Sequence, residues 1–220
     1  MRIRPVLFLA VMIVSPAAFG QLVFGSQDGA FQVGYAANLN IGDSVVNLTN
    51  DGANGGFFIP GGGDPSVGNI CVNTYVFDPQ EEEIGCCACL VTPNGLNSLS
   101  AKSDLISNNL TPAVPTSIVI KLVASTPSPD PATHLTLCNP ATVTVASIPF
   151  TGGMMAWGTT LEPNGSSGTY GVVLVPFLQG TLSPSEFGAL TQVCNFIQSN
   201  GTGFGICKSC RLGGLAGAKQ

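Results

Sequence analysis

The chain has 220 residues, of which 45% are hydrophobic and only 9% are charged, and its formal net charge is −5. Nucleic acids and anionic membrane surfaces require a concentrated basic patch, so this composition excludes both as partners. A surface with so few charges must be covered mostly by Asn, Ser, Thr, Gly and Gln, which is typical of extracellular and cell-envelope proteins.

The N-terminus has the features of a secretory signal peptide. Two arginines precede an apolar run over residues 6–14, and small residues stand before an expected cleavage point between Gly20 and Gln21. The run is shorter than the roughly 20 apolar residues that a permanent membrane helix needs. We therefore expect residues 1–20 to be removed and residues 21–220 to form one secreted domain with no integral membrane segment.

The first strand is expected from Phe31 to Ile41, where apolar residues occupy every second position. This period of two indicates a half-buried β-strand, with Phe31, Val33 and Tyr35 on the side that faces the core. A Gly-rich loop or hinge follows at residues 52–68, which hold seven glycines and two prolines.

Further short segments are rich in Val, Ile and Thr and are separated by Pro, Gly and Asn. These segments are 44–49, 69–77, 84–91, 117–125, 134–138, 142–148, 154–161 and 169–177. The pattern is typical of an antiparallel β-sandwich or a barrel-like fold, and it lacks the alternation of strands and helices that marks a parallel α/β protein. Met154, Met155 and Trp157 are expected to lie in the core, with a binding surface as the alternative.

One helix is predicted within residues 182–201. Ser183 can cap its first turn, Pro184 suits the first helical position, and Glu186 completes a capping box. One apolar stripe follows the three- and four-residue spacing of a helix face, and it consists of Phe187, Leu190, Cys194 and Ile197. We expect this C-terminal α-helix to pack on the sheet with Cys194 turned inward.

The eight cysteines are Cys71, Cys86, Cys87, Cys89, Cys138, Cys194, Cys207 and Cys210. An even number in a secreted chain predicts four disulfides, although 105 pairings are possible. If residues 70–77 and 84–91 form a hairpin, Cys71 comes within about one residue of Cys89, which favours a bridge between them. Cys86 and Cys87 point to opposite faces of their strand and need different partners, of which Cys138, the helix and the C-terminal turn are candidates.

Two alternatives assign chemistry to the same cysteines. Cys86 and Cys89, with Cys207 and Cys210, have the paired spacing of a structural zinc site, which makes zinc the alternative cofactor. The Cys207–Cys210 pair also resembles a thiol-redox motif, and Lys208 and Arg211 would lower a thiol pKa there. An oxidising compartment favours disulfides over both readings.

Acidic residues gather in the loop at residues 78–83. Asp78, Glu81, Glu82 and Glu83 could act in a secreted hydrolase or bind calcium, but such a run in a hairpin loop is usually a solvated turn. We assign no catalytic residue.

Three segments carry a resemblance: ICVNTYVFDPQEEEIGCCACLVTPNGL, DLISNNLTPAVPTSIVIKLVAST and CNFIQSNGTGFGICKSCRLGGL. Across much of residues 70–215 the chain resembles a group of secreted, cysteine-rich bacterial proteins without known function. The resemblance implies a bacterial origin and a shared cysteine framework, and it implies no activity or substrate.

The leading functional hypothesis is a non-enzymatic extracellular or cell-surface protein of adhesive or matrix type. Its partners would be a protein, further copies of itself or an extracellular polymer. In one form of this hypothesis residues 31–41 pair with the open sheet edge of a neighbouring copy. The alternative is an extracytoplasmic metal-binding or thiol-redox protein.

Overall fold

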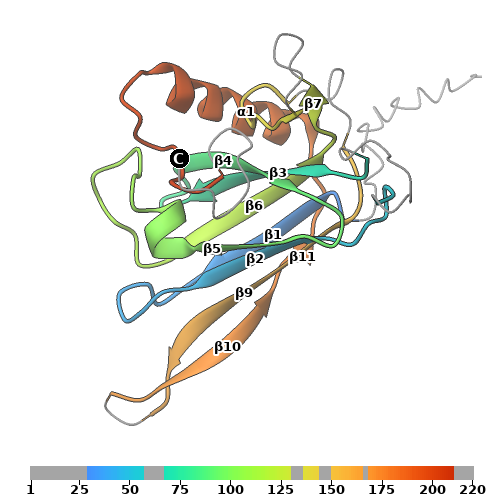
Figure 1. The fold of residues 1–220 in the computed structure, drawn as a ribbon. Coiled ribbons are helices and arrows are strands. Elements are labelled where there is room, and N and C mark those ends of the chain that lie inside the picture. Colours follow the sequence, from blue (N-terminus) through green and yellow to red (C-terminus); the bar gives the residue numbers. More distant parts are fainter. Residues whose placement is uncertain (1–28, 57–66, 130–135, 144–149, 166–167, 211–220) are drawn as a thin grey trace, which may run out of the picture.

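The computed structural model describes residues 29–56, 67–129, 136–143, 150–165 and 168–210. Two antiparallel sheets pack face to face as a sandwich, and one α-helix near the C-terminus lies outside it (Figure 1). The predicted class, a mainly β sandwich with a C-terminal helix, is confirmed.

The larger sheet, sheet A, has the strand order β11-β1-β6-β3-β4. Its strands are β1 (Phe31–Ala36), β3 (Ile70–Phe77), β4 (Glu83–Val91), β6 (Ile118–Ser125) and β11 (Leu178–Gln179). Sheet B has the order β10-β9-β2-β5. Its strands are β2 (Val45–Asn50), β5 (Leu96–Ser100), β9 (Met154–Pro163) and β10 (Tyr170–Pro176). Two further strands, β7 (Ser128–Pro129) and β8 (Thr136–Leu137), pair only with each other.

The hairpin of β3 and β4 forms one end of sheet A and confirms the expected pairing. The facing residues run from Ile70 opposite Val91 to Phe77 opposite Glu83, with a register shift after Val76. The shift is a β-bulge, and it leaves Ile84 without a partner opposite it. All but one of the nine residues of β4 are buried, because sheet B covers one of its faces and the helix packs against the other.

β1 is shorter than expected, and only part of its predicted apolar face is buried. Phe31 and Val33 pack in the core on the helix side of sheet A. The strand ends at Ala36, and Tyr35 is 52% exposed. The residues between these positions, such as Gln32 and Gly34, face sheet B. The Gln32 side-chain amide donates a hydrogen bond to the Met154 carbonyl at 2.7 Å. A Cβ at Gly34 would lie 2.6 Å from the Phe177 ring, so only glycine leaves room for that ring between the sheets. Alternation predicted the strand, but it could not tell which face lies in the sandwich.

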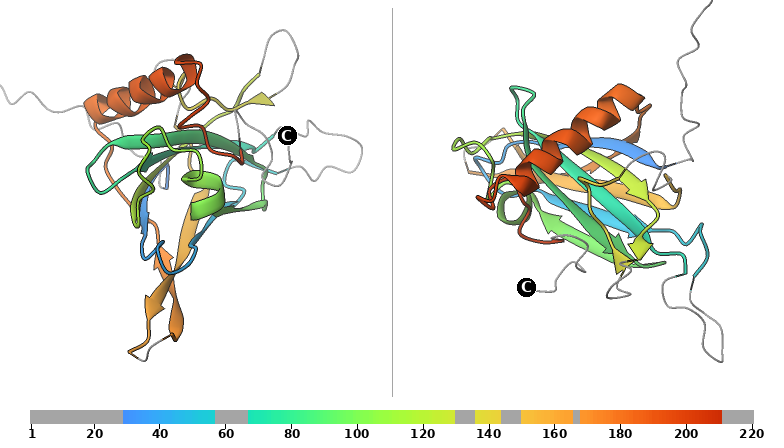
Figure 2. Two further views of the ribbon diagram at one scale, coloured as in Figure 1. Left: turned by 90° about the vertical axis from the view of Figure 1, so that its left-hand side faces the viewer. Right: turned by 90° about the horizontal axis from the view of Figure 1, so that it is seen from above.

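The helix α1 (Pro184–Ser199) begins at the predicted residues, but of the predicted capping box only the Ser183 bond is found. The Ser183 hydroxyl accepts a hydrogen bond from the Glu186 amide, and Asn200 ends the helix. Its predicted apolar stripe is buried, so the helix lies across sheet A on the side away from sheet B (Figure 2). The Glu186 side chain pairs with Lys121 of β6.

Some features were not predicted, and some predictions fall outside the described residues. Strand β5 and the short π-helical turn η1 (Ala101–Leu105) were not expected. Parts of three expected segments, at 52–68, 134–138 and 142–148, lie outside the described residues. Among the helices that the structure describes, none has the length and apolarity to cross a bilayer.

Candidate functional site

The cysteines form four disulfides: Cys71–Cys138, Cys86–Cys194, Cys87–Cys207 and Cys89–Cys210. The predicted bridge between Cys71 and Cys89 is wrong. In the hairpin Cys71 lies opposite Leu90, so Cys71 and Cys89 point to opposite faces of sheet A.

Strand β4 contains three of these cysteines, and their side chains lie on both faces of sheet A. Cys86 joins the sheet to the helix through Cys194, and the helix is one of the partners that the sequence left open for Cys86 and Cys87. Cys87 and Cys89 point into the sandwich and hold the segment after the helix through Cys207 and Cys210. The four cysteines of the zinc alternative thus belong to three disulfides, and in this state they offer no thiolate to a metal.

The segment held by these disulfides covers the outer edge of β4. The Cys86 amide donates to the Gly205 carbonyl at 2.8 Å, and the Cys207 amide donates to the Cys86 carbonyl at 3.4 Å. The Leu110 amide donates to the Ile84 carbonyl at 2.9 Å. The edge of β4 is therefore partnered within the chain at Ile84 and Cys86, where a terminal strand would leave backbone groups open.

The acidic loop is a solvated turn, except for its last residue. The Asp78 carboxylate accepts hydrogen bonds from the backbone amides of Gln80 and Glu82, and Glu81 and Glu82 are exposed. Glu83 is only 8% exposed. Without a bulge, the alternation of side chains along β4 would place Glu83 on the face opposite to Cys86, inside the sandwich. The bulge at Ile84 shifts this alternation, so Glu83 points to the helix side of sheet A.

Glu83 lies in a groove of about 430 Å³ between α1 and sheet A. The groove is lined by Phe77, Asp78, Glu81, Glu83, Val119, Lys121, Glu186, Ala189, Leu190 and Val193. We call these residues the α1 groove. Its walls are mostly apolar, and all of its charged side chains except Lys121 are acidic.

The carboxyl group of Glu83 is unusual in two respects. Its Oε1 atom is buried without a hydrogen-bond partner, and its carboxylate oxygen lies within 4.8 Å of both sulfurs of the Cys86–Cys194 disulfide. Burial raises the pKa of Glu83 to about 9; the Lys121 charge opposes this rise and the Glu186 charge adds to it. Glu83 is therefore a neutral acid at pH 7.

Lys121, the one basic side chain in the lining of the groove, makes two contacts there. Its ammonium group pairs with the Glu186 carboxylate and lies 4.5 Å from the centre of the Phe77 ring. An ion pair and a cation–π contact together fix this side chain across the groove.

A second candidate surface is the outer face of sheet B. By strand register, side chains of β2, β5, β9 and β10 share this face and none of them is charged. Its large exposed members are Val45, Leu96, Met155, Tyr170, Val172 and Leu174. Met154 is buried as predicted, but Met155 is 55% exposed, so the prediction of a core position is wrong for Met155.

Strand β10 forms one border of that face. It pairs with β9 on one side, and on its other side no strand lies among the described residues. The β9–β10 hairpin extends beyond the rest of the sandwich (Figure 1). β1, expected to pair with another copy, has β6 along one side, and on its other side β11 pairs with Gln32 and Val33.

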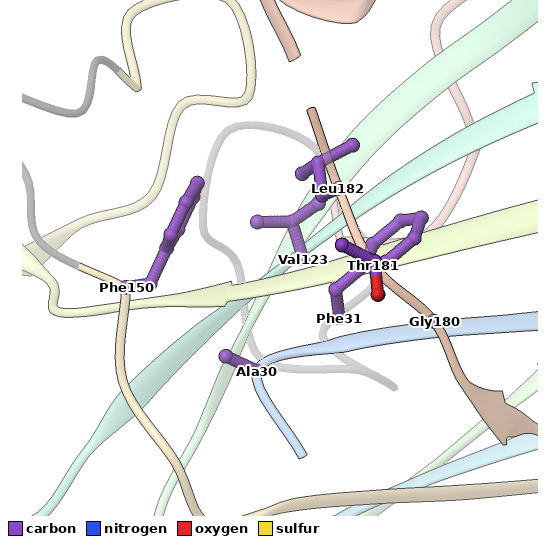
Figure 3. Close-up of a pocket in the computed structure, with 7 residues that line it drawn as sticks. All are labelled: Ala30, Phe31, Val123, Phe150, Gly180, Thr181 and Leu182. Carbon is purple, nitrogen blue, oxygen red and sulfur yellow. The ribbon is translucent and has the colours of Figure 1, made fainter. Parts of the chain in front are cut away.

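A small cavity of about 20 Å³ lies between β1, β6 and the segment that leads into α1 (Figure 3). The lining side chains are mostly apolar and include Phe31, Val123 and Phe150. This volume holds at most about one water molecule, and the cavity offers no charged group. It is a packing gap and not a ligand site.

Comparison of this chain with protein-family models, with curated proteins and with solved structures found no match. A β-sandwich with four disulfides nevertheless indicates an extracytoplasmic protein, because such bonds persist in oxidising compartments.

Proposed function

We propose that this protein is a non-enzymatic, extracytoplasmic interaction protein that associates with further copies of itself through strand β10. The observation that carries the proposal is the outer edge of β10. No strand pairs with this edge in the described part of the chain, and β10 contains no charged residue. Self-association of this kind suits an adhesive or matrix component.

The edge lacks the usual protection against pairing. Soluble proteins commonly protect edge strands with Lys, inward-pointing charges or coverage by another segment. β10 reads YGVVLVP and contains no charged residue, while Val172 is 70% and Leu174 is 64% exposed. Its proline is the last residue of the strand, so it leaves the preceding backbone free to pair.

A second copy of the chain is the partner that best fits this edge. If two β10 strands pair antiparallel around Val173, then Val172 of each copy faces Leu174 of the other, and apolar side chains meet along the whole strand. Such pairing is isologous and would join two four-stranded sheets into one. The uncharged outer faces of the two sheets would then form one continuous surface.

The test is the mass of the purified mature protein in solution, measured by light scattering across a range of concentrations. We expect the wild-type chain to form dimers or larger species, and the double variant Val172→Lys and Leu174→Lys to be monomeric, because facing lysines repel each other at the edge. Val114→Lys is the matched control, since Val114 is 69% exposed but lies outside sheet B. A wild-type chain that stays monomeric at the highest attainable concentration contradicts the proposal.

A further inference from the structure

We propose that the α1 groove binds an organic cation, namely a guanidinium or ammonium group on an apolar chain, with the Glu83 carboxylate as its counter-ion. The charge of the groove favours a cation. Asp78, Glu81, Glu83 and Glu186 contribute four carboxyl groups, and Lys121 contributes one ammonium group. Lys121 pairs with Glu186, and its charge does not outweigh the burial that keeps Glu83 neutral.

Glu83 also lacks a hydrogen-bond partner for an atom that is fully buried. More than nine-tenths of the residue is buried, and no group in the described part of the chain donates to its Oε1 atom. A buried polar atom without a partner is costly, by about 1–3 kcal/mol. A guanidinium or ammonium ligand brings several N–H donors and would satisfy the carboxylate.

The rest of the groove suits the chain that carries the cation. Val119 of β6 and Ala189, Leu190 and Val193 of α1 are apolar, and they can bury a short alkyl chain. The volume of about 430 Å³ is within the range of roughly 300–1,000 Å³ that is usual for small-molecule sites.

Binding should displace a proton. Glu83 faces Tyr75 of β3, Lys121 of β6 and Glu186 of α1, and its pKa of about 9 keeps it protonated at neutral pH. A cation binds the carboxylate form, so the ligand must release this proton at pH 7. The acids Asp78 and Glu81 at the mouth of the groove add to its negative charge. Affinity should therefore rise with pH until Glu83 is ionised.

The test is calorimetric titration of the mature protein with hexylguanidine, whose charge does not change below pH 12. Titrations at pH 7 in two buffers of different ionisation enthalpy should show the release of about one proton per ligand. The affinity should rise roughly tenfold per pH unit from pH 7 to 8.5, since one proton competes with the ligand. Hexylurea, a neutral ligand of the same shape, should not bind.

Variants locate the site. Glu83→Gln keeps the size of the side chain, and at pH 8.5 it should abolish proton release and weaken hexylguanidine binding at least tenfold. Glu82→Gln is the matched control, because Glu82 is the exposed neighbour that does not line the groove. Equal binding of hexylurea, an affinity indifferent to pH in the wild-type chain, or full binding by Glu83→Gln would each overturn the proposal. If Glu83→Gln does not fold, the wild-type pH profile decides alone.

The same cation could come from a free small molecule or from an arginine side chain of another protein. A blocked pentapeptide of four glycines around one central arginine distinguishes these sources. Tighter binding of the peptide than of hexylguanidine assigns the groove to a protein partner, and weaker binding assigns it to a free cation.

Discussion

Strands β4 and β10 both stand at the end of a sheet, yet their surroundings are opposite. β4 is covered along its edge by the segment around Gly205 and on its faces by sheet B and α1. β10 has one neighbouring strand, and five of its seven residues are exposed. Neither strand contains Lys or Arg, so protection by basic side chains does not explain the difference.

The difference lies in covalent attachment. Three cysteines of β4 fix later parts of the chain against it, and β10 contains no cysteine. Disulfides here hold a cover over an edge that would otherwise pair with another chain. The edge of β10 has no such cover in the described part of the chain, so it is the edge available for pairing with another chain.

Removing the cover of β4 should have the largest effect. Replacing Cys87, Cys89, Cys207 and Cys210 by Ala deletes two disulfides, and each should lower the free energy of unfolding by about 2–5 kcal/mol. Urea denaturation measures this loss. Amide hydrogen exchange at Cys86, whose N–H bonds to Gly205, should become faster as the edge opens.

Removal of the Cys71–Cys138 disulfide is the control for this experiment. The Ala variants at these two positions should also lose stability, but they should keep the slow exchange at Cys86, because this bridge does not hold the covering segment. Unchanged exchange in the four-alanine variant would show that the disulfides do not keep β4 covered.

Burial of the Glu83 carboxyl group should lower the free energy of unfolding at neutral pH, and Glu83→Gln should remove this loss. The folded chain keeps this proton up to a pKa of about 9, whereas the unfolded chain releases it near 4.5. The free energy of unfolding should therefore fall as pH rises between these values, by at most about 1.4 kcal/mol per pH unit. Glu83→Gln should flatten this fall and be up to roughly 3 kcal/mol more stable than wild type at pH 7.

Thermal and urea unfolding between pH 5 and pH 8 measure this effect. The exposed neighbour gives the reference, since Glu82→Gln should leave the slope with pH unchanged. Parallel stability curves for wild type and Glu83→Gln would contradict a neutral, buried Glu83.

The smallest effect is expected on β10. Leu174→Ala removes a side chain that is 64% exposed and should change the free energy of unfolding of the monomer by less than about 0.5 kcal/mol. The same deletion on β4, Ile84→Ala, removes a fully buried side chain and should cost about 2–5 kcal/mol. Urea denaturation at low protein concentration compares the two, and similar losses would mean that β10 is covered in solution.

The sequence predicted most strands and the helix, because period-two alternation and capping residues are local signals. The helix is the clearest case: Ser183 and Pro184 start it as expected, and Cys194 turns inward to its disulfide. The faces of β1 were not predictable in this way. Both of its sides are covered in part, so alternation says which residues share a face but not which face lies between the sheets.

The candidate sites depend on features that alternation does not encode. Glu83 reaches the α1 groove only because a bulge at Ile84 reverses the side on which it points. The prediction of a Cys71–Cys89 disulfide is wrong for a similar reason. A shift of one residue in the register of a hairpin reverses the face of every side chain. The exposure of Met155 depends on sheet B having an uncovered face, which no residue near Met155 reveals.

The three bridges of β4 also determine when oxidative folding can finish. Their partners follow 108, 120 and 121 residues later in the chain. During synthesis the thiols of Cys86, Cys87 and Cys89 are therefore present together, close in sequence, long before any correct partner emerges. Early oxidation can join them only to one another or to Cys71 and Cys138, and such bonds must be exchanged later. Correct pairing of these three cysteines is thus a late event, and a thiol–disulfide isomerase should accelerate the maturation of this protein.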